Sequence, residues 1–246
     1  MEKRPGARAS AIIGAVSRAL RIVSVALITA GLVVLADVAA TLGWKEPVST
    51  VYGSIQQGEA EDQLAELERE FPTRADLRKV AHVKNIHQKV KSLAGLFAKR
   101  VHSGQAIGRI QIPGIDLDVV AVQGTDTASL QKGPGHYPET PFPGQGGTSA
   151  LAGHRTTYLA PFRHLDALNP GDAIVIEMPY ANFLYKVQKT RVVDPSDVEI
   201  VHKVGYERLV LTACHPLYSA DQRIAAFAKL QQVSFFALGN RRWGDP

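Results

Sequence analysis

Cysteine is nearly absent from this sequence: Cys214 is the only one in 246 residues, so the chain cannot form an internal disulfide. Internal repeats and low-complexity tracts are not visible either. No set of histidine, cysteine and acidic residues has the spacing of a metal site. We therefore predict neither a metal nor another cofactor.

Clusters of basic residues are missing outside the N-terminus. The net charge is only +5, from 28 basic and 23 acidic residues. Five basic residues lie within the first 21 positions, against a single acid, Glu2: Lys3, Arg4, Arg8, Arg18 and Arg21. The rest of the chain is close to neutral and has no basic cluster with interleaved aromatic residues, so we expect no nucleic-acid partner.

Long apolar runs are rare too, with one exception at residues 22–43. This run of 22 residues contains one charge, Asp37, and about 20 apolar residues suffice for a helix to cross a bilayer. The basic residues 1–21 predict a cytoplasmic N-terminus and an extracytoplasmic chain after Gly43, with Trp44 and Lys45 as interfacial anchors. A cleaved signal peptide is the alternative. The run exceeds the ~7–15 apolar residues of such a peptide, so we expect an uncleaved transmembrane anchor.

Residues 44–104 are predicted to form a linker and a helical stalk. Residues 47–58 are typical of a linker, and the acidic segment 59–70 favours a helix that Phe71 and Pro72 end. Thr73 and Asp76 resemble a capping box that starts a second helix. Apolar residues of this helix recur every three or four positions: Leu77, Val80, Val83, Ile86, Val90, Leu93 and Phe97. The pattern fits either a free stalk or a helix packed on the domain that follows.

Residues 105–246 are predicted to form a mainly β domain. Short runs of strand-like residues are separated by turns rich in Gly and Pro, such as 113–114 and 168–172. Candidate strands cover residues 107–112, 117–122, 150–152, 173–177, 183–189 and 209–212. Many short strands over ~130 residues, with only brief helical stretches between them, favour a closed or nearly closed β-barrel.

The lone thiol of Cys214 is a candidate nucleophile. A free cysteine displayed outside the cell needs a reason to be there, and a nearby base or cation would raise its reactive thiolate fraction. His154, 60 positions earlier, is the candidate base, and Arg223 is the candidate oxyanion donor because a guanidinium donates forked hydrogen bonds but cannot act as a base. Taken singly, these residues fit an inert core cysteine, a structural histidine and a surface arginine. His215 is a rival base, although neighbouring side chains of a strand point to opposite faces.

Four motifs together resemble the sortase family. They are GPGHYPETPFP at 133–143, AGHRTTY at 152–158, LNPGD at 168–172 and LTACHPLYSADQR at 211–223. The resemblance covers residues 105–232, and the motifs agree with the family in order and spacing. It implies an eight-stranded β-barrel with short helices, and a membrane-anchored cysteine transpeptidase of Gram-positive bacteria whose catalytic residues are Cys214, His154 and Arg223.

Such enzymes cleave an LPXTG-type sorting signal between Thr and Gly and transfer the acyl group to an amine. The implied partners are surface proteins that carry the signal and a peptidoglycan precursor or other amine acceptor. The segment 154–158 and the His-Pro after Cys214 are most similar to class E of actinobacteria, which is associated with an LAXTG-type signal. Tyr158 lies where this preference is expected to arise. Thr212 and Ala213 are further expected substrate contacts, and Ala213 replaces a family Thr whose hydroxyl is expected to face the substrate.

The sequence leaves three alternatives to a class E sortase. A pilin-polymerising class C sortase usually carries a lid motif and a second apolar helix, and neither is visible in the sequence. A β-barrel L,D-transpeptidase also uses Cys and His, but its Ser-x-Gly-Cys-x-Arg pattern is absent. A catalytically silent, membrane-anchored binding or scaffold protein on the same fold is the third, and the departure at Ala213 keeps it open.

Overall fold

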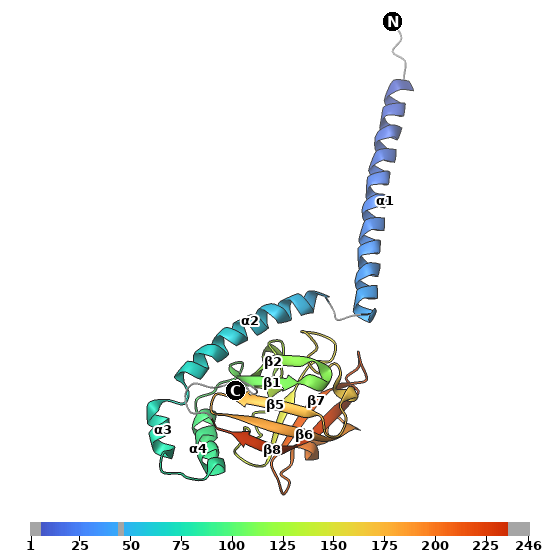
Figure 1. The fold of residues 1–246 in the computed structure, drawn as a ribbon. Coiled ribbons are helices and arrows are strands. Elements are labelled where there is room, and N and C mark those ends of the chain that lie inside the picture. The colour runs from blue at the N-terminus through green and yellow to red at the C-terminus, as the bar shows by residue number, and fades with distance from the viewer. Residues whose placement is uncertain (1–5, 44–46, 236–246) are drawn as a thin grey trace. The chain divides into compact units, whose positions relative to one another are not determined.

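The computed structural model describes residues 6–43 and 47–235 of the chain. The chain divides into two units, Met1–Pro47 and Val48–Pro246, whose elements are labelled in Figure 1. Residues 1–5 of the predicted cytoplasmic tail, the expected interfacial anchors Trp44 and Lys45, and the C-terminal residues 236–246 lie outside the described residues.

The first unit consists of the long helix α1 (Gly6–Gly43). Its stretch Arg18–Ala39 is 22 residues long, has a mean hydropathy of 2.4 and buries none of its side chains against the protein. Leu27 and Leu35, for example, are 68% and 66% exposed. A helix of this length and composition can cross a bilayer. The apolar run predicted at 22–43 is thus helical, and the helix begins 16 residues before it, at Gly6.

The second unit is built around eight strands that close into one barrel in the order β1-β2-β3-β4-β7-β8-β6-β5. The strands are β1 (Ala106–Ile112), β2 (Leu117–Gln123), β3 (Gly135–His136), β4 (Thr148–Ala152), β5 (Ala173–Met178), β6 (Ala181–Val193), β7 (Arg208–His215) and β8 (Gln222–Ser234). Two pairs, β2–β3 and β4–β7, are parallel, and the other neighbours are antiparallel. The eight-stranded β-barrel is confirmed. The two-residue strand β3 and the long strand β8 have no counterpart among the candidate strands.

Short helical turns join several strands: η1 (Pro113–Ile115), α5 (Thr127–Leu130), η2 (Leu165–Ala167) and η3 (Val198–Val201). Strand alternation divides the apolar side chains between the barrel interior and its outer layer. Along β7, Leu209 and Leu211 belong to the main core, whereas Val210 packs with Ala225 and Phe227 in a smaller cluster outside it. This alternation decides which way each site residue of β7 points.

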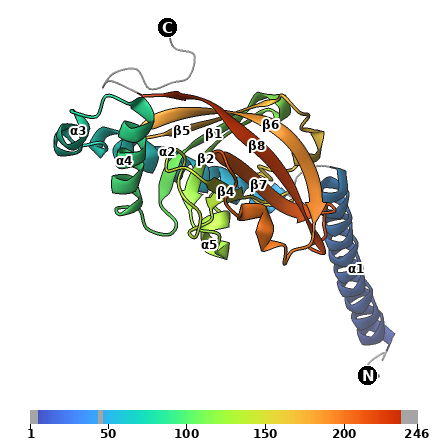
Figure 2. The same cartoon turned by 90° about the horizontal axis from the view of Figure 1, so that it is seen from below.

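The helix α2 (Pro47–Glu70) lies along the outside of the barrel (Figures 1 and 2). The prediction of a linker at 47–58 is wrong, because the helix already begins at Pro47. Ala60 and Leu64 of α2 pack on Ala106 and Val120 of the barrel. Tertiary packing of this face overrides the weak helix propensity of the Gly, Ser and β-branched residues in the first half of the helix.

A polar clamp also fastens α2 to the barrel. The side-chain amide of Gln57 donates to the carbonyls of Val120 and Lys132, and its Oε1 accepts from the Val120 N–H at 2.9 Å. One turn later, Glu61 pairs with Arg109 of β1. These contacts fix the rotation and height of α2 on the barrel surface, since each joins a defined position of the helix to β1, to β2 or to the turn at Lys132.

The predicted second helix is divided into α3 (Arg74–Val80) and α4 (Ile86–Ala98), which lie at one end of the barrel (Figure 2). The hairpin that joins β7 to β8 lies at the opposite end in both ribbon views. Val90, Leu93 and Phe97 of α4 are buried in the main core. Of the two alternatives for this segment, the structure therefore shows helices packed on the domain and not a free stalk.

Asp76 joins α3 to Arg100, two positions beyond the end of α4. The predicted capping box with Thr73 is present, and Arg100 donates to both carboxylate oxygens of Asp76 at 2.7 and 2.9 Å. Burial raises the pKa of Asp76, but the hydrogen bonds from Arg100 and Thr73 outweigh burial and lower the pKa from 3.8 to about 2. Asp76 thus stabilises the fold in its ionised form.

We expect Asp76→Asn to lower the free energy of unfolding by about 1–3 kcal/mol, since it weakens a charge-assisted bidentate pair and the helix cap. The folded-state pKa is depressed, so the contribution of Asp76 is fully present above pH 3.8 and is lost as the pH falls toward about 2. Denaturant unfolding as a function of pH measures both effects. Asp62→Asn, at an exposed position of α2, is the matched control, and an equal loss in both variants would contradict the prediction.

Candidate active site

The strands β7 and β8 bring Cys214 and Arg223 together. In their antiparallel register Cys214 lies directly opposite Arg223, so the two side chains project from the same face of the sheet. Cys214 is a free, half-buried thiol. The Nη1 group of Arg223 donates to the carbonyls of Ala220 and Gln222, both at 2.9 Å. No other hydrogen bond of the guanidinium is found among the described residues, so its remaining N–H groups can bind a ligand beside the thiol.

The parallel pairing of β4 with β7 brings His154 to the end of β7 that carries Cys214. Ala152 pairs with Thr212, and the Gly153 N–H continues the ladder by donating to the Thr212 carbonyl at 3.0 Å. His154 and Cys214 each lie two positions beyond that pair, at the same end of neighbouring strands. Gly153 is required here, because a Cβ at this position would lie 2.5 Å from the ring of Phe162. The packed Phe162 ring fixes the backbone that carries His154.

The imidazole of His154 is held in an apolar setting with one nitrogen unused. Its Nε2 is buried and has no hydrogen-bond partner within the described part of the chain. The ring of Tyr158 packs against it with centroids 5.1 Å apart. Burial lowers the pKa of His154 below its ordinary value of 6.5, so the imidazole is mainly neutral at neutral pH. A buried, unpaired imidazole nitrogen at the end of the strand next to that of Cys214 is suited to accept and return a proton.

The loop after His154 has an unfavourable backbone. Tyr158, Leu159 and Ala160 have positive φ values of 49°, 65° and 46°, a region that costs about 1–2 kcal/mol for a residue with a side chain. Contacts from elsewhere hold the loop: Gln131 donates to the Tyr158 hydroxyl at 3.1 Å, and the Tyr158 N–H donates to Ser49 of α2 at 3.2 Å. The loop conformation therefore depends on α2 and α5 as well as on the barrel.

Arg155 is a residue of the site that the sequence did not single out. Its guanidinium is 2% exposed and connects three segments. Nη1 lies 3.5 Å from the Cys214 carbonyl and 3.1 Å from Nδ1 of His215, while Nε and Nη2 donate to the Arg163 carbonyl and Nη2 pairs with Asp166 at 3.0 Å. A buried arginine fixed in this way holds the end of β7 against the loop after β4. Only its position next to His154 could have drawn attention to it.

Comparison with known proteins identifies the family of this chain. The profile of the sortase domain matches residues 110–231. A crystal structure of sortase E1 from Streptomyces coelicolor, with a tripeptide in its active site, is 30% identical with a TM-score of 0.51, over 54% of this chain and 91% of that one. This chain belongs to the sortase family. Sortase E from Streptomyces avermitilis is also similar, with 32% identity and a TM-score of 0.50 over 55% of this chain and 93% of that one.

Curated sortases of more than one class are similar to this sortase. Sortase D of Bacillus subtilis is 38% identical over 115 residues, which cover 46% of this chain and 57% of the relative. Sortase SrtE1 of Streptomyces coelicolor is 33% identical over 143 residues, covering 52% of this chain and 41% of the relative. The chain spans about half the length of these curated relatives. The similarity therefore establishes the family, and it does not decide between class E and the other classes.

The two predicted substrate contacts beside Cys214 are buried in this sortase. Thr212 is 2% exposed, and its hydroxyl is hydrogen-bonded to that of Tyr137 at 2.8 Å. Ala213 is 4% exposed and lies in the main core with Leu209 and Leu211. Its methyl group thus points to the face of β7 opposite Cys214, because adjacent strand residues alternate. This disagrees with the expectation that the side chain at position 213 faces the substrate, whereas Tyr158 does lie beside His154.

The other histidines near the site of this sortase are used for structure. His215 follows Cys214 on an extended strand, and its Nδ1 must accept the hydrogen bond from Arg155, since a guanidinium only donates. His136 is 1% exposed, stacks on Phe142 at 4.3 Å and lies 2.9 Å from the Gln123 side chain. Burial lowers the pKa of His136 to about 4, so it is a neutral residue that shapes the loop.

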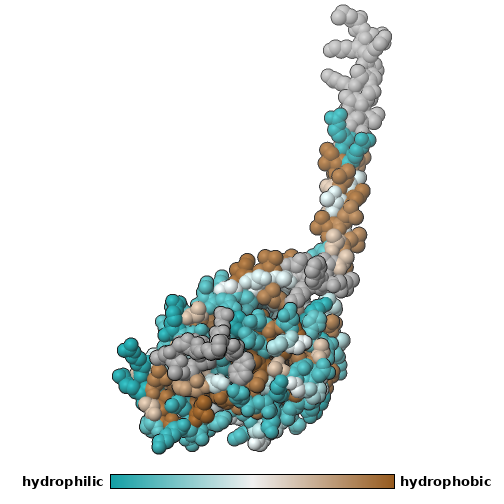
Figure 3. Space-filling view, viewed as in Figure 1, coloured by the Kyte–Doolittle hydropathy of each residue, from teal (hydrophilic) through white to brown (hydrophobic). Residues whose placement is uncertain are grey.

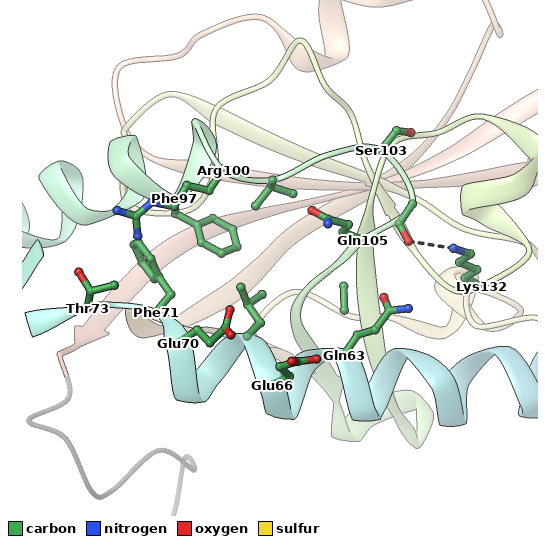
Figure 4. Close-up of a pocket in the computed structure, with 14 residues that line it drawn as sticks. Gln63, Glu66, Glu70, Phe71, Thr73, Phe97, Arg100, Ser103, Gln105 and Lys132 are labelled. Atoms are coloured by element: carbon green, nitrogen blue, oxygen red, sulfur yellow. Dashed lines mark hydrogen bonds between the residues drawn. The ribbon is translucent and has the colours of Figure 1, made fainter.

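A hollow of about 760 Å³ lies elsewhere in this sortase, between α2, the end of α4 and the loop before β1 (Figure 4). Phe71 and Phe97 form part of its wall, and Glu66, Glu70 and Lys132 are at its polar edges. Cys214, His154 and Arg223 do not line it, so it is separate from the candidate site. Within residues 6–43 and 47–235, no three His, Cys, Asp or Glu side chains gather as they would around a metal ion.

We expect Tyr158→Ala to raise the pKa of His154 toward 6.5, because removal of the ring exposes the imidazole to water. NMR of histidine-labelled protein as a function of pH measures this pKa directly. Tyr206→Ala removes an exposed tyrosine that hydrogen-bonds Gln188 and is the matched control. A His154 pKa that is unchanged in Tyr158→Ala would show that the ring does not keep water from the imidazole.

We expect Arg155→Met to lower the free energy of unfolding by about 1–3 kcal/mol, since carbonyl groups around the guanidinium lose their donor. Alkylation of native Cys214 should also change, because the end of β7 loses its fixed position. Denaturant unfolding and the rate of iodoacetamide labelling measure the two effects. Arg191→Met, at a residue that is 54% exposed, is the control. Equal stability and equal labelling in the two variants would contradict a positioning role for Arg155.

Proposed function

We propose that this sortase is a cysteine transpeptidase in which Cys214 is the nucleophile, His154 the proton carrier and Arg223 the oxyanion donor. The observation that carries the proposal is the meeting of the three residues at adjoining strand ends, through the β4–β7 and β7–β8 pairings. The unpaired Nε2 of His154 and the unused N–H groups of Arg223 support the assigned roles.

The reaction proceeds in two acyl transfers. The sulfur of Cys214 attacks the carbonyl carbon of Thr in the sorting signal, and Arg223 donates hydrogen bonds to the oxygen as it becomes negative. The C–N bond to Gly then breaks, and His154 gives its proton to the departing amine, which leaves a thioester on Cys214. An incoming amine attacks the thioester, His154 accepts the proton of that amine, and the C–S bond breaks to return the thiolate.

His154 enters this cycle mainly in its neutral form, because burial lowers its pKa. A small fraction of thiolate with protonated imidazole is then the reactive state, formed by transfer of the Cys214 proton to His154. Tyr158 lies against the imidazole and is the residue to which we assign contact with the sorting signal beside the scissile bond. We assign no such contact to Thr212 or Ala213, whose side chains are buried.

The proposed setting is the outer face of a bacterial membrane. The apolar helix α1 serves as an uncleaved anchor, with the basic residues before it in the cytoplasm and the barrel outside. The partners are surface proteins that carry the sorting signal and an amine of the cell wall. The segment 154–158, which resembles class E, favours an LAXTG-type signal over LPXTG.

Cleavage of quenched fluorescent LAXTG and LPXTG peptides by the full chain in detergent tests the proposal. We expect Cys214→Ala to abolish cleavage, and Arg223→Lys to reduce kcat/KM about 100- to 1000-fold through loss of oxyanion donors. His154→Ala should cost about 100- to 10,000-fold. Arg191→Lys and His164→Ala, at exposed positions, are the matched controls and should retain activity.

Each outcome of the peptide assay has a distinct meaning. Preference for LAXTG supports the class E assignment, whereas preference for LPXTG overturns it and leaves the transpeptidase intact. Failure of the folded protein to cleave either peptide, combined with slow labelling of Cys214 before unfolding, would overturn the enzymatic proposal in favour of a silent scaffold. Formation of covalent pilin-like polymers from a lysine-bearing substrate would instead support the class C alternative.

A further inference from the structure

The first half of α2 exposes an apolar stripe that the barrel does not cover. Val48, Val51, Tyr52 and Ile55 are 73%, 64%, 45% and 57% exposed. They follow one another at intervals of three, one and three residues, so they share one face of the helix. Figure 3, viewed as in Figure 1, shows apolar side chains along the exposed side of α2.

Polarity changes sharply along α2. Residues 47–58 contain no charged side chain, whereas residues 59–70 carry six acids and one arginine. The opposite face of the first half is engaged by the domain: Gly53 packs closely on Tyr158 and Leu159, and the Gln57 amide binds strand backbone. The apolar stripe therefore belongs to an uncharged segment whose rotation is already fixed by the barrel.

The short connection between α1 and α2 limits how far the stripe can lie from the end of α1. Gly43 ends the apolar helix α1, and Val48 is five positions later. Five residues span at most ~18 Å even when fully extended. If α1 crosses a bilayer, Val48 at the start of the stripe must lie within that reach of the point where the chain leaves the membrane. The headgroup region is about 5–8 Å deep on each side, so the short connection keeps the start of the stripe near the membrane surface.

We propose that Val48, Val51, Tyr52 and Ile55 dock on the lipid surface of the membrane that α1 anchors, so that the first half of α2 lies in the interface. The uncharged half would insert its stripe among the lipid headgroups and upper acyl chains, and the acidic half would stay in water. This inference rests on the anchor stated under the proposed function. It adds a second, peripheral contact between the catalytic domain and the bilayer.

A second copy of the chain fits the stripe less well than a lipid surface does. Four partly exposed side chains offer on the order of 400 Å², about half of the ~800 Å² that each partner of a stable protein interface contributes. Binding to a lipid surface has no such threshold, because the anchor already holds the stripe at the membrane. Because the stripe is tethered near the membrane, its binding to lipid does not lose the translational and rotational freedom that a free partner loses on association.

The same turn of α2 also contacts the candidate active site. Tyr52 packs edge-on against Tyr158 with ring centroids 6.0 Å apart, and Ser49 accepts a hydrogen bond from the Tyr158 N–H. Tyr158 in turn covers His154. Docking of the stripe would therefore hold the loop after His154 close to the membrane surface, with α2 between the lipid and the loop.

Fluorescence quenching by brominated lipid tests the docking in the full chain. Cys214→Ala removes the only native cysteine, and single cysteines are then introduced as Val51→Cys, Asp62→Cys or Leu32→Cys and labelled with the environment-sensitive dye NBD. Each protein is reconstituted into phosphatidylcholine vesicles with or without brominated acyl chains. We expect strong quenching by brominated lipid at positions 51 and 32, and little quenching at position 62 of the acidic half.

The label at position 32 separates failure of the docking from failure of the anchor. Strong quenching at position 32 with equally weak quenching at positions 51 and 62 would overturn the docking and leave the anchor standing. Absence of quenching at all three positions would overturn both. A blue-shifted NBD emission at position 51 without quenching by brominated lipid would mean that protein covers the stripe, which also overturns the proposal.

Discussion

The parallel pairing of β4 with β7 is the constraint on which the candidate active site depends. His154 and Cys214 are 60 positions apart, and they meet because each lies two residues beyond the pair Ala152–Thr212. A slip of one residue in this register would turn one of the two side chains to the other face of the barrel. The pairing is specified on both sides, since Leu151 and Leu211 fill the main core while Ala150 and Val210 fill the outer cluster. The hydrophobic pattern of two short strands thus sets the geometry of the site.

A second set of contacts supports the site from outside the barrel. Three consecutive residues with positive φ, from Tyr158 to Ala160, would not persist in an isolated loop. They are held by hydrogen bonds of Tyr158 with Gln131 and with Ser49 of α2, and the Phe162 N–H closes the loop by donating to the His154 carbonyl. Arg155 then joins this loop to the carbonyl of Cys214. The candidate active site is therefore supported by a helix that precedes the sortase domain in the chain.

Much of this arrangement was predictable from the sequence, and the failures have physical causes. Alternating apolar residues and Gly–Pro turns predicted a barrel, and the spacing of four motifs predicted the family. The weak intrinsic helix propensity of residues 47–58 predicts a linker, and contacts such as those of Gln57 with β2 stabilise the helix that forms instead. The apolar pattern continues through Val83, between α3 and α4, so it does not indicate that the two are separate helices. Strand alternation predicts that Ala213 points to the face of β7 opposite Cys214, as observed. The family pattern alone suggests instead that the side chain at position 213 faces the substrate.

Closure of the barrel has a consequence for how a peptide is recognised. Because β1 pairs with both β2 and β5, the described strands form a ring in which each has a partner on both sides. The ring therefore offers an extended ligand no full-length free strand, the feature that proteins with an open sheet edge use to bind a peptide as an additional strand. Side chains and loops at the rim are then the main source of selectivity for a peptide, and substitutions there can change the preferred sequence without disturbing the hydrogen-bonded framework beneath.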